Sequence, residues 1–339
     1  MEEIKPAAEV PDVGNAKRIL AIHSYNKDFD WVVKLDRGFT DALTESGYVL
    51  GKDYNLETFY MDTKVTYTKP EEIQARGMQA EQAIKDYRPD LVFVTDDNAL
   101  TYVAIPYIIS RQSNAPDFVF AGINSDPARF TTVIDSLQKP GKKITGALER
   151  MPVLQGLGLA KRLYPAARRA VIFADKSESS DFALEEIRSL LERNKTGIEV
   201  KKIIQANSFE EWKKEILEAQ SSADLIVIVT YHQLRDKNGD VVPAAEVVQW
   251  TTENNKLPEL GTLQFHAEDG FLMSIGVSGY RSGQYAGELA ARIFSGERAG
   301  DIPIIDPERA AIYLNLSRAK QLNIQIPIDI LGLATKIFP

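Results

Sequence analysis

Cysteine is absent from the 339 residues of this chain, and histidine occurs only three times. The lack of cysteine excludes disulfide bonds, thiolate nucleophiles, zinc ribbons and cysteine-held iron–sulfur clusters. The three histidines, His23, His232 and His266, do not stand at a metal-ligand spacing such as HExxH. The sequence therefore predicts no metal site and no cofactor.

Common enzyme signatures are also missing. The chain has neither a GxxxxGK[ST] phosphate loop nor a GxSxG nucleophile elbow. The segment Gly156-Leu157-Gly158 does not follow a strand and lacks the third glycine of a dinucleotide-binding loop. We expect no catalytic residues, and an enzyme that uses acids in a cleft remains an alternative that would show turnover.

Positive charge is in the minority, because 40 Lys and Arg face 48 Asp and Glu for a net charge of −8. No basic run is long enough to follow a phosphate backbone, so nucleic acid is not an expected partner. No apolar run approaches the roughly 20 residues that cross a bilayer. Residues 1–16 are acidic and contain Pro6, Pro11 and Gly14, which predicts a flexible leader too short for a DNA-binding headpiece.

Apolar residues are plentiful, at 44% of the chain, and short β-type runs alternate with amphipathic helical stretches. This alternation is typical of a parallel sheet covered on both faces. Strands are predicted in the first half at 18–24, 56–63, 90–95 and 118–124, with helices at 30–46, 70–87 and 101–110. In the second half, strands are predicted at 169–174, 200–207 and 224–230, with helices at 179–195 and 208–219.

The two halves repeat each other. Pairing Lys17 with Arg168, Asp90 with Asp224 and Gly122 with Gly261 keeps the element order at separations of 134 to 151 residues. We predict two similar Rossmann-like α/β lobes with a ligand cleft between them. The first lobe comprises 17–146 and 275–307, the second 147–274 and 308–339. Extended segments at 145–149, 272–277 and 304–311 would cross between the lobes and restrict their motion to a hinge.

Ligands of open parallel sheets bind beyond the carboxyl ends of the strands. The polar and aromatic candidates at these ends are Ser24, Tyr25, Asp62, Thr95, Asp96, Asp97, Asn98, Asn124, Asp126, Asp175, Tyr231 and His266. Glu149, at the end of a predicted crossing, and the aromatic residues Trp31 and Tyr280 complete the set. Two alternatives remain open, because Asp and Asn also cap helices and aromatic rings also pack in cores.

Five blocks of the sequence carry a family resemblance: 117–130 (DFVFAGINSDPARF), 145–149 (TGALE), 163–169 (LYPAARR), 283–302 and 311–324. Together they resemble the substrate-binding proteins of ABC transporters that include bacterial tryptophan and tyrosine binders. The resemblance implies a type I periplasmic binding protein fold, with binding roles for the residues of 95–98 and 124–127. Where that family has a Thr-Asp-Asn type of turn, this chain has Thr230-Tyr231-His232.

The function expected from this resemblance is capture of a small organic ligand, such as an amino acid or an aromatic compound, by hinge closure, and its delivery to a membrane permease. We expect a monomer located in the periplasm or outside the cell, associated with the membrane, with any export signal or lipid anchor outside this sequence. Residues 20–31 (LAIHSYNKDFDW) also resemble the outer ligand-sensing domains of bacterial receptors. A sensor domain, or the soluble partner of a signalling receptor, is therefore the alternative.

Overall fold

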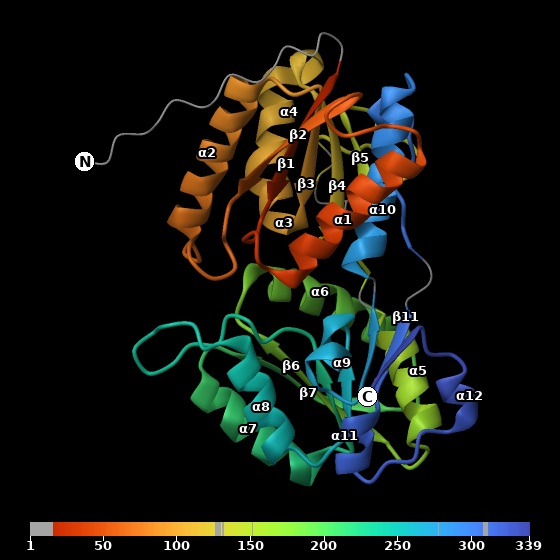
Figure 1. The fold of residues 1–339 in the computed structure, drawn as a ribbon. Helices are drawn as coiled ribbons and strands as arrows, with labels where there is room; N and C mark the ends of the chain where they lie inside the picture. The colour runs from red at the N-terminus through yellow and green to blue at the C-terminus, as the bar shows by residue number, and fades with distance from the viewer. Residues whose placement is uncertain (1–15, 126–129, 131, 151, 277, 308–310) are drawn as a thin grey trace.

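The computed structural model describes residues 16–339 apart from 126–129, 131, 151, 277 and 308–310. Nearly all of the predicted leader and the candidate Asp126 lie outside these residues. The described chain forms two α/β lobes, each built around its own sheet (Figure 1). The predicted fold class is therefore confirmed.

The sheet of the first lobe has five parallel strands in the order β2-β1-β3-β4-β5. They are β1 (Lys17–His23), β2 (Tyr54–Tyr60), β3 (Leu91–Thr95), β4 (Asp117–Ile123) and β5 (Ile144–Leu148). The helices are α1 (Asp30–Glu45), α2 (Pro70–Tyr87), α3 (Asp96–Ala99), a π-helical turn (Leu100–Ala104), α4 (Ile105–Arg111) and, much later in the chain, α10 (Gly279–Phe294).

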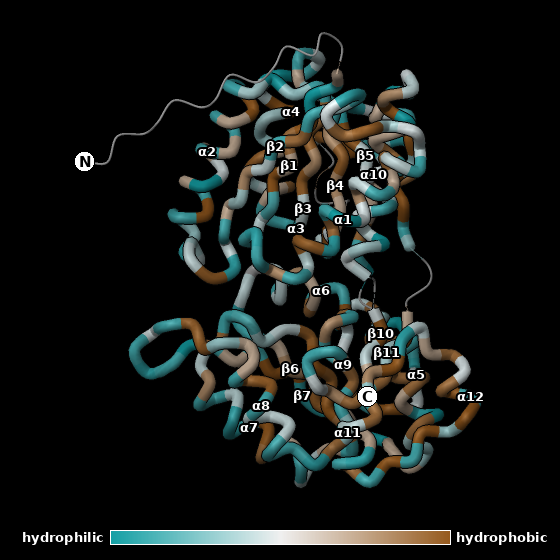
Figure 2. The backbone as a smooth tube through the Cα atoms, viewed as in Figure 1, coloured by the Kyte–Doolittle hydropathy of each residue, from teal (hydrophilic) through white to brown (hydrophobic). Residues whose placement is uncertain are grey.

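Alternation along the strands explains why both faces of this sheet are covered. Ile19 and Ala21 point toward α1 and α10, whereas Leu20 and Ile22 point toward α2 and α4. All four side chains are almost fully buried, as expected for a parallel strand between two helical layers. Figure 2 shows the apolar residues concentrated along the strands and the polar residues on outer helical faces.

The sheet of the second lobe has seven strands in the order β12-β11-β10-β9-β8-β6-β7, with only the β10–β11 pair antiparallel. The strands are β6 (Arg169–Asp175), β7 (Glu199–Ala206), β8 (Leu225–Ile228), β9 (Glu259–Gly261), β10 (Met273–Gly276), β11 (Ala311–Asn315) and β12 (Lys336–Phe338). The helices are α5 (Val153–Leu163), α6 (Glu178–Arg193), α7 (Phe209–Ser222), α8 (Ala244–Asn254), α9 (Phe265–Asp269), α11 (Leu316–Gln321) and α12 (Ile328–Leu331).

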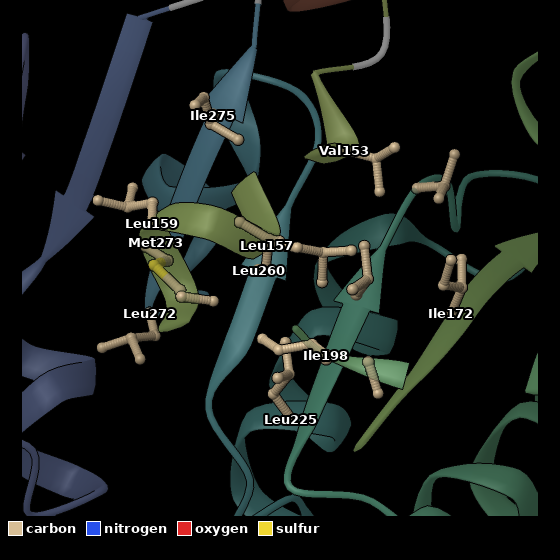
Figure 3. Packing of buried hydrophobic residues seen from close by; sticks show 14 of the residues in the cluster. Val153, Leu157, Leu159, Ile172, Ile198, Leu225, Leu260, Leu272, Met273 and Ile275 are labelled. Atoms are coloured by element: carbon tan, nitrogen blue, oxygen red, sulfur yellow. The ribbon is translucent and has the colours of Figure 1, made fainter. Parts of the chain in front are cut away.

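The core of the second lobe shows why Gly156 and Leu157 are where they are. Leu157 packs with Leu260 of β9 and Ile275 of β10 in one apolar cluster (Figure 3). A Cβ atom on Gly156 would lie 2.8 Å from Ile275 and 2.9 Å from Leu260. The glycine therefore lets α5 approach the sheet closely.

The predicted repeat is visible in the sheet topology. The order β2-β1-β3-β4 of the first lobe recurs as β7-β6-β8-β9 in the second. The predicted crossing segments 145–149 and 272–277 instead lie mainly within the sheets, as β5 and β10, because the chain pairs with neighbouring strands up to Leu148 and from Met273. Ile305 likewise pairs with β5, through its amide to Gly146 and its carbonyl to Leu148.

Sheet membership also bears on the lobe boundaries, which stay a prediction. Ala147 and Leu148 belong to the first sheet, and Ile275 and Gly276 belong to the second.

Within the described ranges, no helix combines the length and apolar character needed to span a bilayer.

Candidate ligand-binding site

Two topological switch points define the site. The strand order reverses between β1 and β3 in the first lobe and between β6 and β8 in the second. Crevices open at such points because the loops of adjacent strands diverge to opposite faces of the sheet. Figure 1 shows α3, which follows β3, on the side of the first lobe that faces α6, which follows β6. The two crevices therefore face each other across the interlobe cleft.

Both lobes line a small, partly open cavity at this place, with a volume of about 40 Å³. The first lobe contributes Tyr25, Phe29, Trp31, Lys64, Asp96, Asn124 and Glu149, and the second contributes Ser179, Ala183, Thr230, His232, Leu263 and Phe265. A single water needs roughly 10–15 Å³ on this kind of measure, so the cavity has room for more than one small group.

The first lobe supplies the acidic wall of the cavity. Asp96 is 3% exposed, and its Oδ1 accepts a hydrogen bond from Trp31 Nε1 at 3.0 Å. Glu149 is 4% exposed, and its Oε2 accepts from Asn124 Nδ2 at 3.2 Å. The remaining oxygens, Asp96 Oδ2, Glu149 Oε1 and Asn124 Oδ1, are buried without a hydrogen-bond partner among the described residues. Three buried acceptors in one cavity call for a ligand that carries several hydrogen-bond donors.

Burial controls the protonation of this wall. Desolvation, followed by repulsion from Asp97, raises the pKa of Asp96 to about 8. Desolvation, followed by the charges of Asp96 and Asp97, raises the pKa of Glu149 well above its usual value. Without a ligand these carboxyl groups therefore favour the neutral form, and a bound cation would favour the ionised form.

Asp97 and Asn98 support the wall rather than form it. Asp97 accepts hydrogen bonds from the backbone amides of Ser125 at 3.0 Å and Asn124 at 3.3 Å, which holds the turn after β4. Asn98 Nδ2 donates to Thr63 Oγ1 at 2.9 Å. Both side chains also line a recess of about 390 Å³ between α2 and α6 that shares Tyr25, Lys64 and Ser179 with the cavity.

Aromatic side chains form another part of the cavity wall. The His232 ring lies 5.3 Å from the Phe29 ring of the other lobe and 5.4 Å from the Phe265 ring. Desolvation, followed by the Lys64 charge, lowers the pKa of His232 to about 3, so its imidazole is neutral at ordinary pH. With Trp31, these rings offer flat, largely uncharged surfaces to a ligand. The same rings border a second recess of about 550 Å³ beside α8.

The lobes also contact each other directly around the cavity. Lys64 Nζ donates to Ser179 Oγ at 3.1 Å, Gln233 Nε2 to the Thr63 carbonyl at 3.3 Å, and Arg235 Nη2 to Thr68 Oγ1 at 2.8 Å. An ion pair of 3.0 Å joins Lys34 of α1 to Glu268 of α9. The cleft is therefore bridged by polar contacts on more than one side.

The backbone at Asp96 adopts an unusual conformation for a residue other than glycine, with φ of 64°. Asp tolerates this left-handed region better than most residues do. Opposite it, Gly122 has φ of 72°, and a Cβ atom there would lie 3.1 Å from Asp96 Oδ1 and 3.3 Å from Trp31. Gly122 thus makes room for the hydrogen-bonded pair of Trp31 and Asp96.

Of the candidates predicted from sequence, the structure brings five into the cavity wall: Tyr25, Trp31, Asp96, Asn124 and Glu149. A helix was predicted at 101–110, and the structure starts a helical segment earlier, because α3 begins at Asp96 directly after β3. Thr95, the last residue of β3, is buried, and its Oγ1 lies 2.9 Å from His23 Nδ1.

Other candidates lie outside the cavity wall and have different partners. Ser24 Oγ donates to the Thr95 carbonyl and accepts from the Ala99 amide, so it fixes the start of α3. Asp62 Oδ2 accepts from Thr66 within its own loop. Tyr280 OH donates to Asp41 Oδ2 at 2.9 Å, which ties α10 to α1.

In the second lobe three candidates lie behind the cavity. Asp175 is fully buried and accepts from Ser177, Ser180 and the Gln233 amide. Tyr231 is fully buried and donates to Asp269. His266 Nδ1 accepts from the Thr262 amide at 3.1 Å.

Eight residues of the cavity wall were not among the candidates predicted from the sequence: Phe29, Lys64, Ser179, Ala183, Thr230, His232, Leu263 and Phe265. Lys64 follows Thr63, which ends a predicted strand, and His232 follows Tyr231, so the strand-end rule came within one residue of both. Ser179 belongs to the first turn of α6, which points at the cleft.

A larger hollow, of about 770 Å³, lies at the far end of the first sheet beside Asp117 and Lys143. None of the buried unpartnered polar atoms found in the described chain belongs to its lining. Cavity volume therefore does not identify the binding site here, whereas buried polar atoms without a hydrogen-bond partner do. Among the described residues, no group of three or more His, Asp or Glu is arranged to hold a metal ion.

Comparison with known proteins supports these conclusions. The sequence profile described as ABC transporter substrate binding protein matches residues 29–338. A tyrosine-binding protein of Clostridioides difficile (strain R20291) is 23% identical over 295 residues, covering 86% of this chain and 77% of that protein.

Two solved structures have the same fold. The ABC domain from Streptococcus pneumonia in complex with L-Trp aligns with a TM-score of 0.72 and 20% identity, covering 96% of this chain and 100% of that one. The ligand-free, open structure of a substrate binding protein with adhesive properties from Clostridium difficile aligns with a TM-score of 0.68 and 19% identity, covering 95% and 99%.

Two similar α/β lobes with a cavity between their switch points define a type I periplasmic binding protein. Because the profile spans most of the sequence, the chain belongs to the ABC transporter substrate-binding protein family. The resemblance predicted from the sequence is confirmed.

Proposed function

We propose that this protein is the extracytoplasmic binding component of an ABC transporter, and that it captures a small organic ligand bearing an amine. The observation that carries this proposal is the set of three buried acceptors in one cavity, Asp96 Oδ2, Glu149 Oε1 and Asn124 Oδ1, which have no hydrogen-bond partner among the described residues. An ammonium group has three N–H donors and a positive charge, and therefore suits such a set. Binding alone, without turnover, is the expected activity.

An amino acid or aromatic compound is the ligand type we favour. The rings of Trp31, Phe29, His232 and Phe265 offer apolar contact area next to the acidic wall. The relatives whose names mention tyrosine and L-Trp are consistent with this choice.

Capture is proposed to occur by closure of the lobes about the segments that join them. The contacts between Lys34 and Glu268 and between Arg235 and Thr68 would form on closure and break on opening. A ligand that contacts both lobes stabilises the closed form by its differential affinity for it. The closed monomer would then present both lobes to a membrane permease.

Isothermal titration of the ligand-free protein with aromatic amino acids and aromatic amines tests this function. We expect saturable binding of at least one such compound with a stoichiometry of one. Small-angle scattering should show a smaller radius of gyration when that compound is added.

The matched variants are Glu149→Gln in the cavity and Glu81→Gln on the surface, where Glu81 pairs with Lys85. Removal of the Glu149 charge should weaken binding by about 10- to 100-fold, because charge-assisted hydrogen bonds are the strong ones. The surface variant should bind as the unaltered protein does. Absence of heat with every amine-bearing compound, or chemical turnover of a bound one, would refute the proposal.

A further inference from the structure

Lys64 is a buried lysine with no carboxylate within ion-pair distance among the described residues. Its residue is 4% exposed, and it lies in the loop that follows β2. Lysine is seldom buried unless its charge is paired. Among the ion pairs found in the described chain, none involves Lys64.

The contacts that Lys64 does make leave part of its hydrogen-bonding capacity unused. Its ammonium donates to Ser179 Oγ at 3.1 Å and lies 5.2 Å from the centre of the Tyr25 ring. An ammonium has three N–H donors, and the contact with Ser179 uses one of them. Because Lys64 lines the cavity, the remaining donors are available to a ligand there.

The second lobe adds to the positive electrostatic potential near Lys64. Ser179 lies in the first turn of α6, a helix of 16 residues whose N-cap, Ser177, accepts from the Ser180 amide. The amide groups at a helix N-terminus favour an anion. Lys64 and the start of α6 thus approach the same point from opposite lobes.

Against the opposing effect of burial, the Lys64 charge helps to lower the pKa of Asp175. The hydrogen bonds of the nearby acids nevertheless involve other groups. Asp175 accepts hydrogen bonds from Ser177, Ser180 and the Gln233 amide and is thereby satisfied. Asp97 is engaged with the turn after β4. Asp96 and Glu149 retain free oxygens at the acidic wall, so the cavity has an acceptor-rich wall and a donor-rich wall.

We infer that Lys64, together with Ser179, holds the carboxylate of a zwitterionic ligand whose ammonium meets Asp96 and Glu149. The cavity therefore selects an α-amino acid over the corresponding amine that lacks a carboxylate. This inference rests on the proposed function and assigns a specificity-determining role to Lys64. Lys64 would also favour closure of the lobes, because the carboxylate of the bound ligand would contact groups of both lobes.

Paired probes test this selectivity: L-tryptophan against tryptamine, and L-tyrosine against tyramine, titrated into the full chain. We expect the unaltered protein to bind at least one amino acid about 100-fold more tightly than its amine, since an unpaired buried ammonium would remain in the amine complex. Lys64→Met should weaken binding of the amino acid about 100-fold and change binding of the amine by only a few fold.

Two further variants control for structure. Lys176→Met removes an exposed lysine that borders the adjacent recess, and it should leave the preference intact. Ser179→Ala retains Lys64 and should reduce the preference for the amino acid without eliminating it. The thermal unfolding temperature of each variant shows whether the fold is kept, and Ser179→Ala preserves the test if Lys64→Met unfolds.

Each outcome has a separate meaning. Equal or tighter binding of the amine by the unaltered protein, or equal weakening of both probes by Lys64→Met, overturns this inference and leaves the proposed function standing. Failure of the unaltered protein to bind any amine-bearing probe overturns the proposed function and this inference with it.

Discussion

Asp96 carries several constraints in one residue. It is buried, it accepts a hydrogen bond from Trp31, and its backbone lies in the left-handed region. Its pKa is raised to about 8 by burial and by Asp97, whereas an unfolded chain would ionise it near the usual value of 3.8. The folded ligand-free protein thus retains a proton that the unfolded chain releases.

The sign of the resulting pH dependence follows from linkage. A carboxyl group with a raised folded pKa stabilises the fold most below its unfolded pKa, and this contribution is lost as pH rises toward about 8. Asp96→Asn removes the titration, and Asn tolerates the same backbone conformation. The free energy of unfolding of Asp96→Asn, taken relative to that of the unaltered protein, should therefore rise between pH 5 and pH 8, by an amount on the order of a few kcal/mol.

Urea unfolding of the ligand-free protein at several pH values measures this difference. Asp224→Asn is the control, because Arg169 holds the pKa of Asp224 down at about 2, outside the range tested. That variant should shift stability by the same amount at pH 5 and at pH 8. Parallel curves for Asp96→Asn and the unaltered protein would contradict the account of Asp96.

At the residue scale, the carboxyl ends of the strands predicted part of the site, because the topology of a parallel sheet places ligands beyond these ends. This rule found Asp96 and Asn124, whose strands are long and apolar. The same rule could not distinguish Asp96 from Asp97. Asp96 lines the cavity, whereas Asp97 accepts a hydrogen bond from the Ser125 amide. Lys64 was missed because nothing in its sequence neighbourhood indicates burial.

At the scale of elements, the closest packing joins α1 to α10. A Cβ atom on Gly283 would lie 2.1 Å from the Leu35 carbonyl oxygen, and one on Gly38 would lie 1.9 Å from the Tyr280 carbonyl oxygen. Glycines on both helices therefore let the backbones meet. Their contact sets the layer that covers β1, β3 and β4 on one face.

Gly283→Ala should destabilise the protein by about 1–3 kcal/mol, because the added methyl group must separate two backbones. Gly158→Ala is the matched substitution in another helix, since nothing lies within 4 Å of the added Cβ atom. There alanine should stabilise by about 0.5–1 kcal/mol through its better helix propensity. Urea midpoints of the ligand-free proteins provide the comparison, and equal effects at both positions would refute this explanation.

Elements themselves were largely predictable, since periodicity reports burial directly. The helix at 70–87 was predicted with the bounds that the structure gives it. Charged residues inside the core were not predictable in this way. Glu259 of β9 and Arg318 of α11 form a buried ion pair, and only the tertiary fold brings these two residues together.

At the scale of the whole molecule, Lys34 and Glu268 hold the two lobes together at the mouth of the cleft. Exposed ion pairs contribute about 0.2–1 kcal/mol, so this contact shifts the balance between open and closed forms by a small factor. Glu268→Gln should increase the radius of gyration of the ligand-free protein and weaken ligand binding by about two- to fivefold.

Small-angle scattering and titration calorimetry measure these two quantities. Glu297→Gln, which removes a pair with Arg292 inside the first lobe, should change neither. High salt should reduce the difference between Glu268→Gln and the unaltered protein because it screens the pair. Identical scattering and affinity at low salt would show that the contact does not influence closure.

The position of α10 has a consequence for synthesis of the chain. This helix completes the first lobe, yet it begins 234 residues after the last residue of its partner α1, Glu45. At roughly 5–20 residues per second, the ribosome needs about 10 to 50 seconds to make that interval. During this time, the apolar face of α1 is not yet covered by α10. The first lobe therefore stays incomplete, and exposed to chaperones and to aggregation, until α10 has been synthesised.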